Sequence, residues 1–456
     1  MDALVTPLDF KTSASRLQNH VRDRDTELLR RLVWLYFILL IFEGGLRKWF
    51  LPGLATPLLV VRDPLAAYIV FETWRRGLLP STPYLYIMVI TGVLAFFTSL
   101  ILGHGNLWVT LFGARILLIH FPLMFAIGRL FTRADVIRIG KTTLFLAVPI
   151  SILIAVQFYS PQSAWVNLGI GADSEGSGFS GAMGYFRPSA TFSFTTGTTL
   201  FFGLVGAFIL FFWTGKDKIN KLLLAGSSMA LLMAIPFSIS RSLLFGVMIS
   251  SVFTIIAVTR NPTYLKRTII TIAGVATLLA ILLQVEIVQN ALLVFTTRFE
   301  VASESEGGLK GIFIDRYLGG LIGALIEAHR FPFFGYGIGL GTNVGSMLMK
   351  GEVLYLISEG EWGRLIGELG AVMGMIVIAL RLGFCVKVAL AAYQKLIKGD
   401  LLPWILLSFG LLLIPQSQWG QPTTLGFSTL VGGLLLASLR VNVADLPTQK
   451  DKATCQ

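Results

Sequence analysis

Long apolar runs separated by short polar stretches dominate the chain. A helix needs about 20 apolar residues to cross a hydrocarbon core of about 30 Å, and twelve runs approach that length. They cover residues 32–50, 57–75, 84–103, 107–131, 142–160, 190–213, 221–239, 242–259, 268–288, 363–393, 401–417 and 424–440. Glu43 and the Arg62–Asp63 pair interrupt the first two runs, and Arg241 separates the seventh from the eighth. The pattern predicts an all-α polytopic membrane protein with about 12 transmembrane helices.

Two long segments are too polar to cross a membrane. Residues 161–189 are rich in glycine and serine, so we expect a mobile loop or lid there. Residues 289–362 mix charged residues and glycine with amphipathic stretches such as 318–328, which is typical of an ordered extramembrane subdomain. The expected parts are a tail (1–31), nine helices (32–288), the subdomain (289–362), three helices (363–440) and a second tail (441–456).

The positions of lysine and arginine predict the orientation, because cytoplasmic loops carry an excess of both. With the N-terminus inside, most of the 37 cations fall in the tails and in the short cytoplasmic loops. Two short outer loops, 104–106 and 418–423, carry no cation. We therefore expect both termini in the cytoplasm and the 289–362 subdomain on the outer side, which is the periplasm in a Gram-negative cell.

Composition supports the same class of protein. Hydrophobic residues make up 54% of the chain and charged residues only 14%, against about 25% charged in soluble domains. A soluble globule and a disordered chain are therefore excluded. The net charge of +12 comes largely from the predicted cytoplasmic loops, so it does not point to a nucleic-acid partner.

No motif for a cofactor or a metal is found. The four histidines are scattered over both sides of the predicted membrane. The alternate glycines of 335–341 lack the spacing of a dinucleotide fingerprint. The two cysteines, Cys385 and Cys455, form no disulfide framework. We expect no cofactor and no metal.

Several charged residues lie in or beside the outer halves of the predicted spans. A charge at the bilayer centre costs about 2.5–3.5 kcal/mol, so such residues usually face the protein interior or a wet cavity. They are Arg62, Asp63, Arg115, Arg187, Arg241, Arg298, Arg316, Arg364 and Glu368. One interpretation is structural ion pairing, as between Arg364 and Glu368 four residues apart. The other is an electropositive basin that opens outward and binds an anionic lipid headgroup or a diphosphate, which arginine binds bidentately.

Four motifs, in this order, resemble those of the O-antigen ligase and O-antigen polymerase superfamily. Arg187-Pro-Ser-Ala-Thr-Phe resembles its R-x-x-G-T-F element, and Ser240-Arg241-Ser242-Leu243 its S-R-[GS]-hydrophobic element. Arg316 followed by the glycine-rich stretch 331–339 resembles the R…P-hydrophobic-G-hydrophobic-G-x-G stretch of its large periplasmic loop. Residues 361–370 with Gly374 resemble its H-N-x-Y-L-x-x-L-x-E-x-G-x-x-G element at the start of the next span. The resemblance covers most of residues 80–440.

The resemblance implies a GT-C-like glycosyltransferase of the bacterial inner membrane, with its active site facing the periplasm. Such enzymes move a glycan from undecaprenyl diphosphate to an acceptor hydroxyl, with inversion and without a metal. The acceptor is another lipid-linked glycan in a polymerase and lipid A core in a ligase. Partners would be these lipid-linked glycans and the bilayer, and can include other proteins of polysaccharide assembly.

The same resemblance assigns expected roles to individual residues. Arg187 and Arg241 would hold the diphosphate, where negative charge grows in the transition state, and Arg316 would be a third contact. Arg115 and Arg298, which belong to the expected electropositive basin and to no family motif, are further expected diphosphate or glycan contacts. Gly337 and Gly339 would let the backbone approach the sugar or the lipid, or belong to a plain loop on the membrane surface.

The expected general base departs from the family pattern. Ligases carry a histidine nine residues before the position of Glu368, and this chain has Glu359 there, with Glu361 two residues later. A carboxylate can take the proton of an acceptor hydroxyl, so Glu361 or Glu359 is the expected base beside Arg364. Glu361 can instead neutralise Arg364 three residues later, and His329 is a further candidate. The missing histidine favours a polymerase over a ligase.

A transporter or flippase for an anionic solute or lipid is the alternative. It would use the same cationic basin. Transporters usually place charge near the midplane on broken helices within repeated halves, and this sequence shows no internal repeat.

Overall fold

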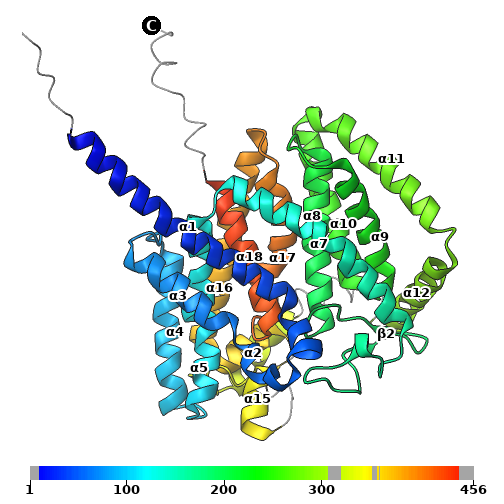
Figure 1. Ribbon diagram of the computed structural model, residues 1–456. Coiled ribbons are helices and arrows are strands. Elements are labelled where there is room, and N and C mark those ends of the chain that lie inside the picture. The colour runs from blue at the N-terminus through cyan, green and yellow to red at the C-terminus, as the bar shows by residue number, and fades with distance from the viewer. Residues whose placement is uncertain (1–9, 307–319, 352–356, 359, 441–456) are drawn as a thin grey trace, which may run out of the picture.

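The computed structural model describes residues 10–306, 320–351, 357–358 and 360–440. Within these ranges the regular elements are helices apart from one short β pair, and loops such as 168–178 and 331–342 join them (Figure 1). The α-helices are α1 (Phe10–Gly45), α2 (Ala55–Leu59), α3 (Arg62–Arg75), α4 (Pro83–Ile101), α5 (Leu107–Arg115), α6 (Phe121–Leu130), α7 (Arg133–Tyr159), α8 (Thr195–Thr214), α9 (Lys221–Phe237), α10 (Arg241–Arg260), α11 (Leu265–Leu282), α12 (Glu286–Glu306), α14 (Gly320–Glu327), α15 (Asn343–Lys350), α16 (Glu361–Ile397), α17 (Leu402–Gln416) and α18 (Pro422–Leu439).

Shorter elements join these helices. Two π-helical turns, η1 (Leu46–Phe50) and η3 (Ile116–His120), continue α1 and link α5 to α6. Four 3-10 turns are η2 (Pro52–Leu54), η4 (Trp165–Asn167), η5 (Pro262–Tyr264) and η7 (Ala328–Arg330). Strands β1 (Phe179–Ser180) and β2 (Phe186–Arg187) pair antiparallel.

The structure confirms an all-α polytopic membrane protein. Nine helical stretches among the described residues are long and apolar enough to cross a membrane. The three other predicted runs also fall on helices, namely α1 with η1, the 17-residue α9 and the 15-residue α17. The predicted number of 12 crossings needs all of these helices to span, and it stays a prediction.

Two helices have bounds that differ from those of the predicted apolar runs. Helix α7 begins at Arg133 and not at 142, because the Thr132 hydroxyl and the Asp135 carboxylate form a capping box over its first turn. Helix α11 ends at Leu282, and α12 starts at Glu286 within the predicted ninth run. The amphipathic stretch predicted at 318–328 contains α14.

The tenth predicted run, 363–393, is not one straight helix. Gly370 has a positive φ of 77° inside α16, a conformation that glycine adopts readily. Glu361 and Arg381 would lie about 30 Å apart along a continuous helix of 20 residues, yet their side chains form an ion pair of 2.6 Å. The half-helix 361–369 therefore folds back along the rest of α16.

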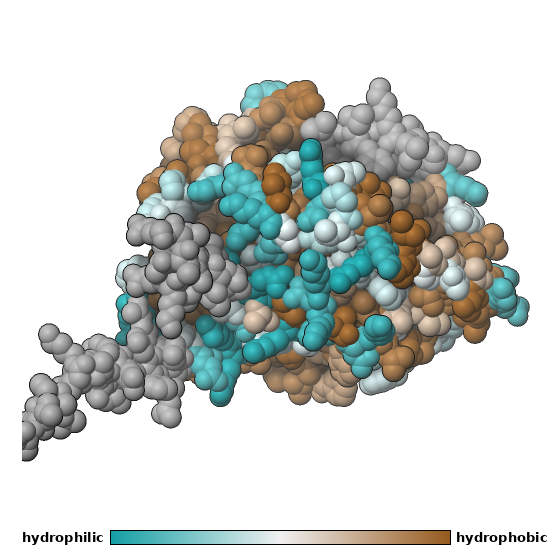
Figure 2. Space-filling model, turned by 90° about the horizontal axis from the view of Figure 1, so that it is seen from above, coloured by the Kyte–Doolittle hydropathy of each residue, from teal (hydrophilic) through white to brown (hydrophobic). Residues whose placement is uncertain are grey.

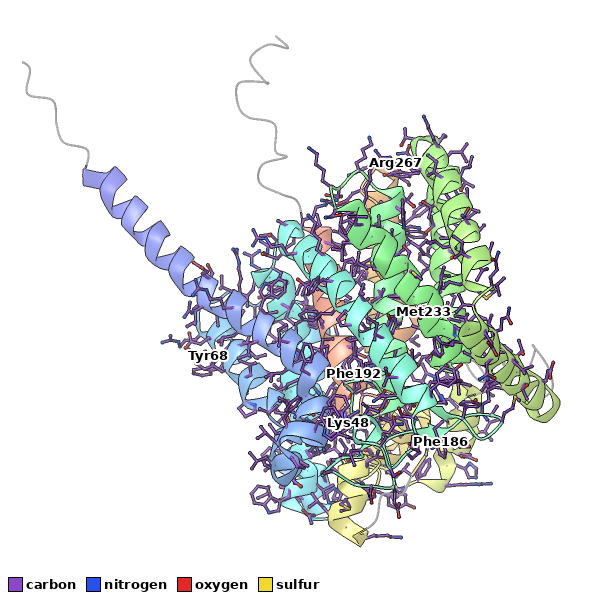
Figure 3. All side chains as sticks on the ribbon, turned by 45° about the vertical axis from the view of Figure 1, so that its right-hand side comes forward. Lys48, Tyr68, Phe186, Phe192, Met233 and Arg267 are labelled. Atoms are coloured by element: carbon purple, nitrogen blue, oxygen red, sulfur yellow. The ribbon has the colours of Figure 1, made fainter. Side chains whose placement is uncertain are left out.

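Contacts between loops gather them at two opposite ends of the helix bundle. At one end Arg30 donates to Leu130 O, Arg133 pairs with Asp217 at 3.1 Å, and Arg440 donates to Phe131 O. Figure 2 looks onto this end and shows hydrophilic residues across its centre and hydrophobic ones around its edge. Arg267 lies at this end and Lys48 and Phe186 towards the other (Figure 3). The predicted cytoplasmic loops thus share one end.

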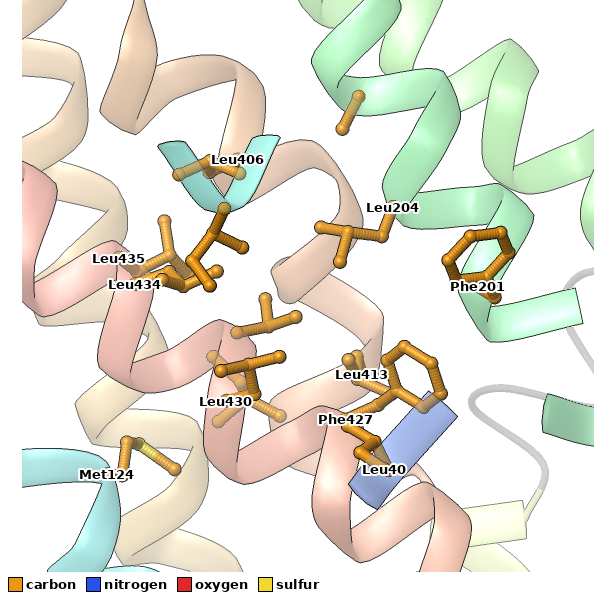
Figure 4. Close-up of a cluster of buried hydrophobic side chains, with 14 of the residues drawn as sticks. Leu40, Met124, Phe201, Leu204, Leu406, Leu413, Phe427, Leu430, Leu434 and Leu435 are labelled. Atoms are coloured by element: carbon orange, nitrogen blue, oxygen red, sulfur yellow. The ribbon is translucent and has the colours of Figure 1, made fainter. Parts of the chain in front are cut away.

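The bundle core is formed by leucine, phenylalanine and other apolar side chains of α1, α6, α8, α17 and α18 (Figure 4). Leu40, Phe201, Leu204, Phe427 and Leu430 are all 3% exposed or less. Helices α1, α6 and α8 pack against α17 and α18. This packing positions the loop 417–421, which joins α17 to α18 at the end opposite the cation-rich one.

Segment 161–189, predicted as a mobile loop or lid, is tied to the bundle at both ends. The buried Asn167 amide donates to the carbonyl of Gln157 at 3.0 Å, and Gln157 in turn binds Val166 O and the backbone N–H of Ala190. Ser177 and Ser189 hydroxyls are 2.7 Å apart. Only the portion between these anchors is left to act as a lid.

Candidate functional site

Four charged side chains of α16 form a buried ion-pair network, here called the α16 cluster: Glu361, Arg364, Glu368 and Arg381. Arg364 pairs with Glu361 at 2.9 Å and with Glu368 at 2.6 Å, and Arg381 pairs with Glu361 at 2.6 Å. All four residues are at most 4% exposed. The structure therefore confirms the predicted ion pairs of Arg364 with Glu361 and with Glu368.

Glu361 is fully engaged by donors. It accepts from Arg364 Nε (3.0 Å), Arg364 Nη2 (2.9 Å), Arg381 Nη1 (2.6 Å) and the backbone N–H of Trp419 (3.2 Å). A carboxylate has about four acceptor sites, so all are used. Accepting a proton from a substrate would require Glu361 to release an arginine, which weighs against its expected role as general base.

Arg381 ties the cluster to α17 and to the loop that follows. Its Nε donates to Ile414 O at 3.0 Å and its Nη2 to Ser417 O at 3.3 Å. Its guanidinium lies 4.1 Å from the ring centroid of Trp419, a cation–π arrangement. Sequence reasoning did not use Arg381; the available signal was a single arginine inside a long apolar run, since such a charge needs an interior partner.

A polar pocket opens beside the α16 cluster. Its empty volume, including its mouth, is about 260 Å³. The residues that line it are Gly341, Thr342, Asn343, Ser358, Gly360, Glu361, Arg364, Gln418, Gly420 and Gln421. Three chain segments that are far apart in sequence meet here: 341–343, 358–364 and 418–421.

The pocket is recessed below the outermost part of the bundle. Arg381 follows the break at Gly370 by 11 residues, which is about 16 Å along a helix. Irregular backbone at membrane depth is tolerated where it is buried in protein or lines a water-filled cavity. The folded-back half-helix and the loop 417–421 meet this condition, because they enclose the pocket.

The glycines of the stretch 335–341 are buried, although Tyr336 between them is exposed. Gly337 and Gly339 have positive φ values of 107° and 93°, and both are buried. A Cβ on Gly339 would lie 2.2 Å from Val109 O, so only glycine allows this approach to α5. The Gly341 N–H donates to Glu368 Oε1 at 2.9 Å. The close contact that these glycines allow is therefore with protein backbone, and it joins α5 to the α16 cluster.

The elements that carry Arg187, Arg241 and Arg298 meet at one place, here called the arginine corner. Arg187 ends the β1–β2 hairpin, and Arg298 Nη1 donates to Gly181 O of the same hairpin at 3.2 Å. Arg241 begins α10 directly after Ser240, whose hydroxyl lies 2.9 Å from that of Thr199 on α8. The hairpin also approaches the turn before α10, because a Cβ on Gly181 would lie 2.6 Å from Ile239 Cδ1. The elements that carry three of the expected contacts therefore lie in one region of the molecule.

Two cations of η1 hold the chain that follows Arg187. Arg47 Nη1 donates to Ser193 Oγ at 3.0 Å. The fully buried Lys48 donates to Ser189 Oγ at 3.0 Å and to Ala190 O at 2.6 Å. Figure 3 shows Lys48, Phe186 and Phe192 in this part of the molecule. The arginine corner is therefore fixed to the same end of the bundle as the pocket.

Arg115 belongs to a second buried network, here called the α1–α3 cluster: Glu43, Arg47, Arg62, Asp63, Arg115 and His120. Arg115 pairs with Asp63 at 2.5 Å, and His120 Nε2 lies 2.9 Å from the same carboxylate. Glu43 binds Arg62 at 2.8 Å. Arg115 is 6% exposed, so contact with a substrate would require the Asp63 pair to open.

The remaining expected site residues lie elsewhere. His329 is exposed on η7, where its Nδ1 lies 2.6 Å from Ile326 O, and it does not line the pocket. Arg316 and Glu359 lie outside the described residues. In the part of the chain that the structure describes, no three His, Cys, Asp or Glu side chains are grouped to hold a metal ion.

Comparison with protein-family models finds no match, and comparison with curated proteins finds none either. Function therefore has to be inferred from the geometry of the site and from the resemblance of short motifs.

Proposed function

We propose that this protein is an inner-membrane glycosyltransferase that moves a glycan from undecaprenyl diphosphate to an acceptor hydroxyl on the periplasmic side. The product is an O-antigen or exopolysaccharide. The absence of the ligase histidine favours a polymerase over a ligase. In the reaction the acceptor oxygen bonds to the anomeric carbon with inversion while its proton passes to a general base. The bond from that carbon to the phosphate oxygen breaks, and undecaprenyl diphosphate leaves.

One observation carries the proposal. Three arginine-bearing elements, at residues 187, 241 and 298 of the sequence, approach one another at the arginine corner on the same end of the bundle as the recessed polar pocket. Guanidinium groups positioned at a leaving diphosphate stabilise the charge that grows there. Arg187 and Arg241, the two with motif resemblance, are assigned to this role, and Arg298 supports them.

The α16 cluster is assigned to building the pocket wall. Glu361 and Arg364 bind each other through two hydrogen bonds. These bonds hold the pocket wall in place, and neither group is assigned to proton transfer. Glu359, outside the described residues, stays the base candidate that the sequence indicates.

The test is a reconstitution of the purified protein with a lipid-linked oligosaccharide as donor. We expect Arg187→Ala and Arg241→Ala each to reduce the rate of transfer by about 100-fold, the usual effect of losing one transition-state donor. Lys216→Ala is the matched control, since Lys216 is an exposed cation at the opposite end of the bundle. Equal product from the wild type and both arginine variants would remove the diphosphate assignment.

One feature of α16 favours the transporter as a second candidate. Discontinuous helices near a binding site are characteristic of secondary transporters, and α16 is broken at Gly370. Flux of an anionic solute in proteoliposomes, lost in Arg115→Ala, would support that candidate. Transfer activity without flux under any ion gradient would reject it.

A further inference from the structure

The pocket beside the α16 cluster differs chemically from a site for an anion. Glu361 and Arg364 line its floor and pair with each other, and Glu368 and Arg381, which do not line it, complete the charge balance of the network. Glu361 also sits in the first turn of its half-helix, where a carboxylate offsets the positive end of the helix dipole. A phosphate or a uronate would find no surplus cation on this floor.

The rim of the pocket offers neutral hydrogen-bonding groups. Asn343, Ser358, Gln418 and Gln421 contribute amides and a hydroxyl, which donate and accept hydrogen bonds without charge. Gln421 Nε2 donates to Gln418 Oε1 at 2.5 Å, so the two amides form one connected edge. Three of the ten lining residues are glycines, so a ring-shaped ligand can approach the backbone.

The mouth of the pocket is open. The volume of about 260 Å³ includes this mouth, so a ligand would lie across the rim and not be fully enclosed. We propose that the pocket binds one unit of a neutral, hydroxyl-rich glycan, and that this unit belongs to the acceptor. The assignment of the glycan as acceptor rests on the proposed function, whereas the binding itself does not.

Binding can be measured on the full-length protein without any lipid-linked donor. Neutral tetrasaccharides of glucose, galactose and mannose are titrated by saturation-transfer NMR, with a galacturonate tetramer and inorganic diphosphate as charged probes. We expect at least one neutral probe to bind, and Asn343→Ala and Gln421→Ala to weaken it about threefold to tenfold, the usual effect of losing one hydrogen bond. Gln284→Ala, an exposed glutamine outside the pocket, is the control and should bind as the wild type does.

Three results would overturn the assignment: no neutral probe binds, the two pocket variants bind like the wild type, or the charged probes bind more tightly. Each leaves the proposed function standing if transfer from the lipid-linked donor still depends on Arg187. Conversely, neutral glycan binding that is sensitive to Gln421→Ala, in a protein without transfer activity, would keep the pocket and reject the transferase. A rise in the KM for the acceptor in Asn343→Ala, at unchanged kcat, would show that the glycan unit bound in the pocket belongs to the acceptor of the transfer reaction.

Discussion

The α16 cluster and the α1–α3 cluster are both buried networks of arginine and carboxylate, yet they have opposite relations to the pocket. The α16 cluster balances two carboxylates against two arginines, and two of its members, Glu361 and Arg364, line the pocket. The α1–α3 cluster has two carboxylates against three arginines, and it does not line the pocket. Within the described chain, Arg62 Nη1 and Arg115 Nη2 have no hydrogen-bond partner.

This difference shows that surplus positive charge does not by itself mark the open site. The cation-rich network is the one enclosed by helices, and the balanced network is the one that borders open space. A balanced network can form the wall of a site for a neutral ligand, because its charges are already satisfied by each other. The stretch 337–341 connects the two networks, since Gly339 packs on Val109 and Gly113 of α5, the helix that carries Arg115, and Gly341 binds Glu368.

The largest effect is expected from Glu361→Gln. It removes the charge shared by Arg364 and Arg381 and leaves a buried guanidinium without compensation, which typically costs about 3–5 kcal/mol. We expect the free energy of unfolding, measured by denaturant titration in one detergent, to fall by that amount. Glu327→Gln is the control, because its carboxylate is 57% exposed and 3.9 Å from Arg330. A Glu361→Gln protein that is fully stable and inactive in transfer would return Glu361 to the role of base.

A smaller effect is expected from Asp63→Asn in the α1–α3 cluster. Asp63 binds Arg115 and His120, and its side chain is 16% exposed. Loss of hydrogen bonds to a charged partner is worth about 1.5–3 kcal/mol, so unfolding should become easier by that amount in the same titration. Glycan binding should stay unchanged, since Asp63 does not line the pocket. Lost transfer activity at unchanged stability would place this cluster on the substrate path and favour the transporter.

Much of the fold follows from the sequence because the length of an apolar run is a local property. Each of the predicted runs falls on helices in the described structure. The fold-back of α16 does not follow, because it depends on a distant segment: a Cβ on Gly370 would lie 1.9 Å from Phe333 O. The sequence shows the glycine at position 370, but it does not show that the backbone 37 positions earlier packs against it.

In the candidate site, too, some contacts could be predicted from the sequence and others could not. The pair of Arg364 with Glu368 was predictable, since residues four apart share a helix face. The pair of Glu361 with Arg381 was not, because it exists only after the half-helix folds back. Gln418 and Gln421 gave no signal at all; amides in a short loop become a pocket rim only when α17 and α18 place them there.

Gly339→Ala tests the connection between the two networks. Its φ of 93° and the 2.2 Å approach to Val109 O combine backbone strain with overpacking, which costs about 1–3 kcal/mol. Gly351→Ala is the matched control, because Gly351 also has a positive φ (77°) but nothing within 4 Å of its Cβ position. We expect the melting temperature of Gly339→Ala to fall further than that of Gly351→Ala, and its glycan affinity to fall as well. Equal melting temperatures would show that the stretch 337–341 is not a rigid connector.

The smallest effect is expected from Arg133→Ala, which removes an ion pair of the same composition at the opposite end of the bundle. Arg133 binds Asp217 through both terminal nitrogens at 3.1 Å and approaches Asp400 at 3.5 Å, so its geometry rivals that of Arg364. Its side chain is 25% exposed, against 5% for Arg364. Partly exposed pairs contribute about 0–1 kcal/mol and weaken with salt. The unfolding titration, run at low and high ionic strength, should therefore show a loss below about 1 kcal/mol that shrinks with salt. A loss as large as that of Glu361→Gln, and independent of salt, would mean that hydrogen-bond geometry and not burial sets the strength of these networks.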